Sequence, residues 1–364
     1  MEISKNTQPY FVNIDFGTSD VKVIIRHGTR TEQFGIETFS LPTTRRYVGQ
    51  DANTIVEPEE HAGLAGGFLG EMQAAHITLT PNFYTERKFP TIVMVCLAKA
   101  LAVMNAPETC RVWLSFALPA SHIGKADVII KRFEQTFKVS RPKETPRRVT
   151  IEKVLIESQP GCVIHDQILT YKAAGSSRVE LSDERGDRLM QDAPLWVFLS
   201  GSRTQEQAWF SGSFSEIPKH SSSKFFGTFN LMDDLARMIH AEYGIQLNDF
   251  EVMFEAFKTG KFEYRNTEFK TGEMSRELVR TFFTGQDMKD YIEQFLNKQP
   301  VFPKTAILAG GTMIYGAESF QATFGGMFRQ MFVAQDDSGV PNPIWTVASG
   351  LDKFSQLAYA EAME

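Results

Sequence analysis

Two apolar segments that each run into a small-residue turn constrain the fold of this chain more than any other feature. Residues 13–22 read NIDFGTSDVK, and residues 306–313 read AILAGGTM. Such runs are typical of buried strands, and glycine at their ends lets the backbone approach another segment or a ligand closely. Because about 290 residues separate the two segments, a fold that uses both together includes nearly the whole chain.

The first segment belongs to a predicted β-hairpin. Residues 10–15 and 21–26 are rich in apolar and β-branched side chains, and residues 16–20 form the turn between them. Residues 31–40 are a candidate third strand. The same strand–turn–strand plan returns at residues 195–210, with strands at 195–199 and 207–210 and a turn at 200–204. This repetition predicts two related domains.

The other expected elements follow from apolar periodicity and from turn residues. We expect a glycine-rich surface subdomain at 41–85, an amphipathic helix at 88–105, strands at 111–118 and 149–156, a helix at 126–137, a loop or hairpin tip that crosses between domains at 174–194, mostly helix from 228 onward, a strand at 305–309, and a turn at Ser349 and Gly350 before a final helix.

The composition excludes several classes of protein. A net charge of −6 provides no global basic field for nucleic acid or for an anionic membrane. The three cysteines and seven histidines show no zinc-ligand spacing, and so few cysteines favour a reducing compartment. No apolar run is long enough to span a bilayer, and the start of the chain shows no secretory signal. We therefore expect a cytoplasmic protein that binds neither a membrane nor nucleic acid directly.

The turn of the first hairpin carries residues that suit a phosphate group. Gly17, Thr18 and Ser19 can direct backbone N–H groups and hydroxyls into one concavity, and Lys22 adds a positive charge. Asp15 stands just before the turn, where a carboxylate can hold Mg²⁺ through water. A plain hairpin with a surface aspartate is an equally good interpretation of this segment alone.

Two later turns have related chemistry. The turn at 201–204 offers donors for the same phosphates, although a solvated turn is the simpler interpretation; its residues are Gly201, Ser202, Arg203 and Thr204. Gly310, Gly311 and Thr312 follow a buried strand and precede a helical stretch. A nucleoside can lie against such glycines and a helix N-terminus. The alternative is a strand-to-helix turn that has no ligand.

The order of these three segments is more specific than any one of them. Further segments support it: residues 115–119 (SFALP), 156–160 (IESQP), 198–204 (FLSGSRT), 257–260 (FKTG) and 345–351 (WTVASGL). Together they resemble the actin superfamily, and within it the ParM-like plasmid-segregation actins of bacteria and archaea, over residues 10–355. The resemblance implies an α/β fold of the actin and sugar-kinase type. Two duplicated, ribonuclease H-like domains would flank a nucleotide cleft, one made of residues 1–170 plus 340–364 and the other of residues 171–339.

The resemblance also implies roles for individual residues, with ATP or GTP and Mg²⁺ as cofactors. The first phosphate loop would be Gly17, Thr18, Ser19 and Lys22, the second Gly201, Ser202, Arg203 and Thr204, and the adenosine motif Gly310, Gly311 and Thr312. Asp15 would serve catalysis and hold the metal through water. Glu157 corresponds to the residue that orients the attacking water, with Gln159 as second choice. Lys258 resembles a nucleotide-contacting lysine, although an exposed helix lysine is an equally good interpretation.

One position departs from the family pattern. The second phosphate loop normally begins with an aspartate, and this chain has Leu199 there. Leucine cannot hold hydrated magnesium or polarise water, so hydrolysis would be slowed more than binding. Arg203 could offset phosphate charge, and Asp20 or Glu206 could replace the missing acid; the sequence does not decide among them.

Three functions remain open at this point. The first is an ATP-dependent, filament-forming actin-like protein with slow ATPase activity. It would assemble with itself and move plasmid or other DNA through a DNA-bound adaptor protein. The second, which Leu199 favours, is a degenerate actin-like scaffold that binds nucleotide without efficient hydrolysis. The third is a small-molecule kinase of the same superfamily, for which no catalytic carboxylate is evident.

Overall fold

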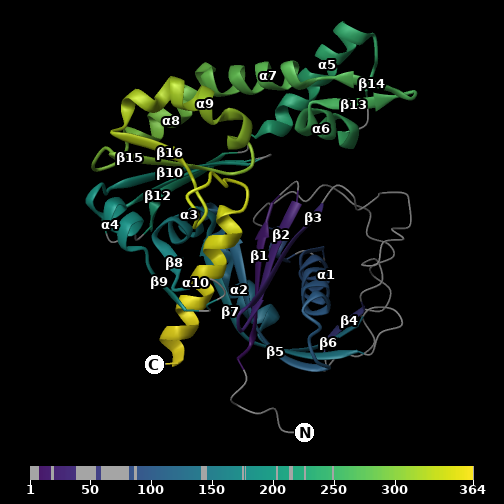
Figure 1. Cartoon of the computed structure of the whole chain (residues 1–364), viewed down its shortest axis with the longest axis vertical. Coiled ribbons are helices and arrows are strands. Elements are labelled where there is room, and N and C mark those ends of the chain that lie inside the picture. Colours follow the sequence, from purple (N-terminus) through teal and green to yellow (C-terminus); the bar gives the residue numbers. More distant parts are fainter. Residues whose placement is uncertain are drawn as a thin grey trace. The chain divides into compact units, whose positions relative to one another are not determined.

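The computed structural model contains two main β-sheets, one in each of two compact units (Figure 1). The first unit is Met1–Gly186 with Val347–Glu364, and the second is Asp187–Thr346. The structure describes residues 8–17, 20–37, 55–58, 82–85, 88–140, 146–173, 176, 178–201, 204–212, 216–224, 227–247 and 250–363. The expected domains, residues 1–170 plus 340–364 and residues 171–339, stay a prediction.

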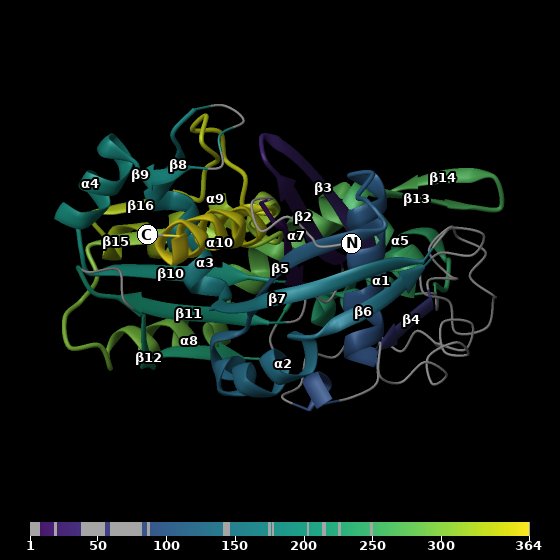
Figure 2. The ribbon, with the colours of Figure 1, turned by 90° about the horizontal axis from the view of Figure 1, so that it is seen from below.

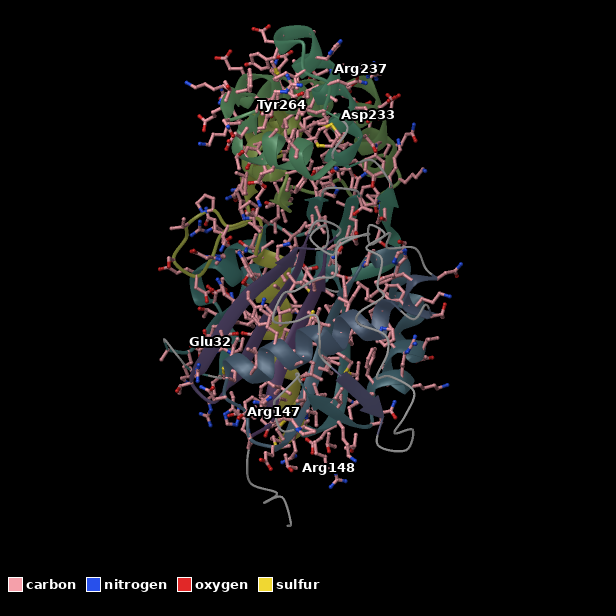
Figure 3. All side chains as sticks on the ribbon, turned by 90° about the vertical axis from the view of Figure 1, so that its right-hand side faces the viewer. Glu32, Arg147, Arg148, Asp233, Arg237 and Tyr264 are labelled. Atoms are coloured by element: carbon pink, nitrogen blue, oxygen red, sulfur yellow. The ribbon has the colours of Figure 1, made fainter. Side chains whose placement is uncertain are left out.

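Seven described strands form the sheet of the first unit, in the order β3-β2-β1-β5-β7-β6-β4. Their bounds are β1 Tyr10–Phe16, β2 Asp20–His27, β3 Arg30–Glu37, β4 Ile55–Pro58, β5 Thr109–Leu118, β6 Thr136–Ser140 and β7 Arg147–Ser158. β1 pairs antiparallel with β2 and parallel with β5, which in turn pairs parallel with β7. Figure 3 shows Arg147 and Arg148 where β7 begins, at the edge of this unit.

Helices cover both faces of this sheet. They are α1 Lys88–Val103, α2 Ala126–Phe133, α3 Gln159–Ile168 and α10 Thr346–Met363, with short 3₁₀ turns η2 Phe83–Thr85 and η3 Ala120–Lys125. Phe16 and Phe116 of the sheet contact Phe89 of α1 on one face. On the other face Phe11 and Trp113 contact Tyr359 of α10. Figure 1 shows α1 and α10 on opposite sides of β1.

The second unit has a sheet of five described strands, in the order β12-β11-β10-β15-β16, which can be followed in Figure 2. The bounds are β10 Leu195–Ser200, β11 Gln205–Phe210, β12 Glu216–Lys224, β15 Thr305–Ala309 and β16 Gln330–Val333. Helices of this unit are α5 Met232–Tyr243, α6 Phe250–Thr259, α7 Gly272–Thr284, α8 Gln286–Leu296 and α9 Met313–Phe324, with 3₁₀ turns η4 Thr228–Leu231 and η5 Gly325–Met327. Trp196 and Phe198 of β10 belong to its core, together with Phe320 of α9.

The two sheets repeat one strand plan. In each, the first strand pairs antiparallel with the second, the second pairs antiparallel with the third, and two parallel strands continue on the other side of the first. The strands β3-β2-β1-β5-β7 thus correspond to β12-β11-β10-β15-β16. This correspondence confirms the predicted α/β fold with two related halves.

Several sequence-based expectations about local structure are wrong. The prediction for residues 174–194 is partly right: β9 Val179–Leu181 pairs with β8 Leu169–Tyr171 as a hairpin, and the boundary between the two units falls at Gly186 and Asp187. Helix α4 Asp183–Gln191 was not expected. The expected helix at 126–137 ends at Phe133, and Phe137 lies in β6. The helix expected to be amphipathic at 88–105 ends at Val103, and nearly all its described side chains are buried or half-buried.

The expected turn at Ser349 and Gly350 is also wrong, because both residues lie inside α10. A Cβ at Gly350 would come 1.7 Å from the carbonyl oxygen of Cys162 in α3. Glycine therefore serves close packing of two helices here instead of a bend. The expected subdomain at 41–85 lies largely outside the described residues. Among the helices in the described ranges, none combines the length and apolar character that a membrane crossing requires.

Candidate functional site

Asp15 lies near the carboxyl end of β1, on the face of the first sheet opposite α1. Val12, Ile14 and Phe16 enter the core, so the alternate residue Asp15 points to the other face. It is only 4% exposed, and its Oδ1 accepts a 2.8 Å hydrogen bond from Nε2 of Gln159, the first residue of α3. The structure therefore places the second-choice residue, Gln159, directly against the predicted metal ligand.

Lys22 faces the same side as Asp15, since the two are direct partners across the β1–β2 hairpin. Gly17 follows β1 and is partly exposed. The other two predicted residues of this loop, Thr18 and Ser19, lie outside the described residues. Within the described part, the first hairpin brings an acid, a base and a glycine to one end of the sheet.

A buried polar network lies beside Asp15, on the face of the first sheet opposite α1. Asn13 Nδ2 donates to Asp352 Oδ1 of α10 at 2.9 Å, and Arg26 Nη2 pairs with Asp352 Oδ2 at 2.8 Å. Tyr171 also donates to Asp352, and its ring lies 4.2 Å from the Arg26 guanidinium carbon. Burial alone would lower the pKa of Arg26, but the Asp352 carboxylate outweighs it and raises that pKa. The network fixes β1 and β2 to the last helix.

Glu157 lies on the same row of the sheet as Asp15. Ala117 of β5 is the register partner of Asp15 on one side and of Glu157 on the other. Because strands are spaced about 4.8 Å apart, the two acidic residues are about 10 Å apart at their Cα atoms. The sheet thus brings both predicted catalytic residues to one edge and one face.

The Glu157 carboxylate folds over the first turn of α3. Its Oε1 accepts from the Ser158 amide at 2.6 Å, and its Oε2 lies 3.2 Å from Nε2 of His165. A Cβ at residue 161 would come 2.5 Å from Oε1, so Gly161 provides the space that this carboxylate occupies. Glu157 is partly exposed, which leaves it accessible to water.

In the second unit, the ends of β10 and β15 meet at their glycines. Gly310 has φ +92°, and a Cβ there would come 2.2 Å from the Ser200 carbonyl oxygen. Thr312 donates from its amide to Ser200 O and from Oγ1 to Gly201 O, both at 3.3 Å. Gly201 in turn donates its amide to Thr204 O at 2.9 Å. The predicted residues Gly201, Thr204, Gly310 and Thr312 therefore form one cluster.

The surroundings of this cluster suit a ligand. Ser200 Oγ is buried and has no hydrogen-bond partner among the described residues. At Gly311 a Cβ would meet nothing within 4 Å, so packing does not require glycine there. Ile314 and Tyr315, in the first turn of α9, are 49% and 40% exposed. Ser202 and Arg203, the remaining residues predicted for this turn, lie outside the described residues.

Lys258 lies close to the same turn through its backbone. Its carbonyl oxygen accepts a 2.8 Å hydrogen bond from Tyr315 Oη, and the neighbouring Phe257 ring contacts Tyr315 at 6.3 Å between centroids. The Lys258 side chain is exposed and lies 4.0 Å from Glu255. The sequence pattern gave no sign of Tyr315, because its contact with Lys258 spans 57 residues of sequence and its exposure is a property of the folded chain.

The donor set fits magnesium that is held mainly by water and phosphate. Among the described residues, no group of three or more His, Cys, Asp and Glu side chains gathers as a protein metal cage would. Mg²⁺ usually keeps several waters and binds one or two carboxylates together with substrate phosphates. Asp15, which is buried and oriented by Gln159, has the chemistry that one such carboxylate would need.

Comparison with known proteins gives a consistent structural answer and no match in sequence. No protein-family model matches the chain, and no curated protein matches it significantly. Many solved structures are similar in fold, and three of them illustrate the likeness. The archaeal actin homologue Ta0583 is 15% identical, with TM-score 0.67 over 95% of this chain and 99% of its own. It has also been solved in complex with ADP.

Two ParM proteins are similar to the same degree. The Bacillus thuringiensis ParM structure with ATP is 12% identical, with TM-score 0.68 over 97% of this chain and 99% of its own. A non-polymerisable quadruple mutant of pCBH ParM is 13% identical, with TM-score 0.64 over 96% of this chain and 100% of its own. At these identities the likeness establishes the fold.

Proposed function

Because the chain has the fold of the actin-like proteins, we propose that it binds ATP, or GTP, with Mg²⁺. The observation that carries the proposal is the cluster at the second glycine turn, where Gly310 packs against Ser200 and leaves Gly311 open. Similar proteins have been solved with ATP and with ADP. Gly17, Lys22 and the turn residues 201–204 would contact phosphates.

The base and ribose would lie at the start of α9. Glycine backbone at 310 and 311 permits close approach of the nucleoside, and the N-terminus of α9 would attract the negatively charged phosphates attached to it. The exposed side chains Ile314 and Tyr315 offer an apolar surface for a base. The Lys258 carbonyl accepts from Tyr315, which holds this lysine next to the predicted contact. We assign Thr312 to the contact with the base and ribose as well.

Slow ATP hydrolysis is part of the proposal. Glu157 would orient the attacking water as a partly exposed carboxylate, and Asp15 would hold the metal-bound water. When bound, Mg²⁺ neutralises phosphate charge. Gln159 keeps Asp15 in place by donating to it, which prevents the carboxylate from rotating away from the turn.

Nucleotide binding is tested by titrating a fluorescent ATP analogue into the protein with Mg²⁺ or with EDTA. We expect saturable binding, and a drop of at least about tenfold in affinity with Mg²⁺ for Asp15→Asn, because one charge-assisted contact is lost. Asp287→Asn, an exposed change on α8, is the matched control and should bind as the wild type does. Absence of saturable binding in the wild type contradicts the proposal.

We further propose that the protein assembles into ATP-dependent filaments that position DNA through an adaptor protein. Support comes from the fold and from the similar ParM that was studied as a non-polymerisable mutant. Light scattering and negative-stain electron microscopy after addition of ATP and Mg²⁺ test assembly. Filaments that need nucleotide support it, and an unchanged monomer at high protein concentration contradicts it.

A nucleotide-binding scaffold without turnover is the alternative, and Leu199 favours it. This residue replaces the aspartate expected at the second phosphate loop and is 7% exposed. Phosphate release distinguishes the two. Release that Asp15→Asn abolishes supports the ATPase, whereas tight ATP binding with no release supports the scaffold.

A further inference from the structure

We propose that Glu206 supplies the carboxylate that position 199 lacks, so that the acid of the second hairpin has moved from its first strand to its second. This inference rests on the proposed binding of nucleotide with magnesium. It assigns to Glu206 the contact with metal-bound water that an aspartate at 199 would make. The reasons are strand register, orientation and surroundings.

The two hairpins have the same register. Asp15 lies opposite Lys22 and beside Ala117, while Leu199 lies opposite Glu206 and beside Ala309. Six residues separate the partners in both hairpins. Leu199 is therefore the structural counterpart of Asp15, and Glu206 is the counterpart of Lys22.

Glu206 points to the same side of its sheet as Leu199. Directly opposed residues of an antiparallel pair share a face, with Cβ atoms about 4.5–5.5 Å apart. Phe198 and Leu308 enter the core on one face, so Leu199 and Glu206 lie on the other. The flanking Gln207 confirms this alternation, because its Nε2 donates to the Tyr291 carbonyl of α8 at 3.1 Å.

The surroundings of Glu206 are compatible with this role. Its exposed fraction is 0%, so the surrounding side chains restrict where its carboxylate can lie. Its neighbours on that face include Ala208 and Ala309, whose small side chains leave room for a carboxylate. The extra methylene of glutamate gives additional reach from the second strand.

The chemistry requires only an acceptor at this end of the hairpin. A carboxylate accepts hydrogen bonds from magnesium-bound water, and phosphoryl transfer depends on positioning and charge neutralisation more than on covalent steps. With Glu206 in this role, each hairpin carries one buried acid, Asp15 in the first unit and Glu206 in the second. The acid that is missing at position 199 is then replaced from the opposite strand of the same hairpin.

The experiment measures how much Mg²⁺ strengthens binding of a fluorescent ATP analogue, relative to EDTA. Glu206→Gln keeps the shape and removes the charge. We expect the increase in affinity that Mg²⁺ causes to be at least about fivefold smaller in this variant than in the wild type. Its affinity in EDTA should stay unchanged. Leu199→Asp combined with Glu206→Gln returns the acid to the first strand and should restore the gain to within about twofold. Glu263→Gln, on the exposed hairpin strand β13 Lys261–Tyr264, is the matched control.

The outcomes separate this inference from the proposed function. If the wild type shows no binding under either condition, the proposed function fails. If the wild type shows the gain and Glu206→Gln keeps it, this inference alone is overturned. Thermal unfolding checks each variant, and if Glu206→Gln does not fold, the double variant decides. Its full gain supports the relocated acid, and a lost gain contradicts it.

Discussion

At the scale of single residues, Gly310 is the most constrained position of the candidate site. Its φ of +92° disfavours any side chain, and a Cβ would overlap the Ser200 carbonyl. We expect Gly310→Ala to lower the free energy of unfolding by at least about 2 kcal/mol, because strain and overlap add. Urea denaturation measures this.

Gly311→Ala is the matched control, since nothing lies within 4 Å of its Cβ position. Its stability should change by less than about 0.5 kcal/mol. Its affinity for ATP should fall, however, because a methyl group would intrude where we place the nucleoside. Equal stability losses at both glycines would contradict this division between a packing residue and a binding residue.

Gln159 offers a second test at this scale. Gln159→Glu places a carboxylate 2.8 Å from Asp15, and two adjacent carboxylates cannot both ionise easily. The pair therefore has a raised pKa in the folded variant, so the variant loses stability as pH rises through that pKa. We expect its melting temperature, relative to wild type, to fall between pH 5 and pH 8. Gln286→Glu makes a similar pair with Asp290, but both side chains are exposed on α8, so solvent screening should make its trend much smaller.

The sequence pattern indicated some residues of the candidate site and not the contacts that orient them. Asp15 and Gly310 could be chosen because each ends an apolar strand. The Gln159 contact joins positions 144 residues apart, and no local pattern records such a pair. Gly350 was misinterpreted because glycine signals a turn in sequence but also permits close helix contact. Assignments to ligand contacts, including Lys258 and Thr312, stay predictions.

At the scale of elements, α7 and α9 approach each other through one glycine. A Cβ at Gly316 of α9 would come 1.9 Å from the ring of Phe283 in α7. Gly316 and Phe283 are both buried, and the Phe283 ring contacts Phe320, so this ring cannot move away freely. We expect Gly316→Ala to destabilise the protein by about 1–3 kcal/mol, measured by chemical denaturation.

Two further variants test the reason for that loss. Gly325→Ala, with nothing within 4 Å of its Cβ position, should be neutral or slightly stabilising. Phe283→Leu combined with Gly316→Ala should be less destabilised than the sum of the single changes, because a smaller side chain makes room for the methyl group. Additive losses would show that the crossing does not depend on this contact.

The short element η3 contains a histidine that should make stability pH-dependent. Burial, and then the nearby Lys125 charge, lower the pKa of His122, whose Nδ1 lies 3.1 Å from Tyr84 Oη. The unfolded chain therefore binds a proton more readily than the folded one. The contribution of neutral His122 to the free energy of unfolding is fully present above about pH 6.5. It is lost as the pH falls through the lowered pKa of the folded state.

We expect His122→Gln to flatten the fall in melting temperature between pH 7 and pH 5. The change removes the titrating ring, so the two states no longer differ in proton uptake at this position. His240→Gln, an exposed change on α5, is the control and should keep the wild-type slope. A slope that His122→Gln leaves unchanged would mean that other groups govern acid sensitivity.

Elements were predictable where their pattern was local. The strands β1, β2, β5, β10 and β15 were all anticipated because each is rich in apolar and β-branched residues. The hairpin of β13 and β14 Thr267–Lys270 was missed, since its turn residues Arg265 and Asn266 have positive φ without any glycine. Figure 3 shows Tyr264 at this hairpin. Helix α4 was missed because its sequence is mostly polar.

At the scale of the whole molecule, the chain returns to its first unit with its last helix. Asp352 of α10 bonds Asn13 across 339 residues of sequence and pairs with Arg26 across 326. The predicted nucleotide site at the end of β1 thus rests on a strand that α10 fixes in place. Local sequence patterns cannot reveal this closure, because buried ion pairs of this kind are formed only when the whole unit has folded.

Removing the Asp352 charge should therefore weaken the first unit as a whole. Asp352→Asn leaves the Arg26 guanidinium, 5% exposed, without its counter-charge, and breaking a buried pair from one side costs about 3–5 kcal/mol. We expect amides of β1 and β2 to exchange hydrogen faster, as measured by mass spectrometry.

Arg26→Met combined with Asp352→Asn should recover much of the lost stability, since no unpaired buried charge remains. Glu32→Gln, which removes the exposed partner of Arg30, should change little. If the double variant is no more stable than Asp352→Asn alone, the network acts through packing of Asp352 and not through charge.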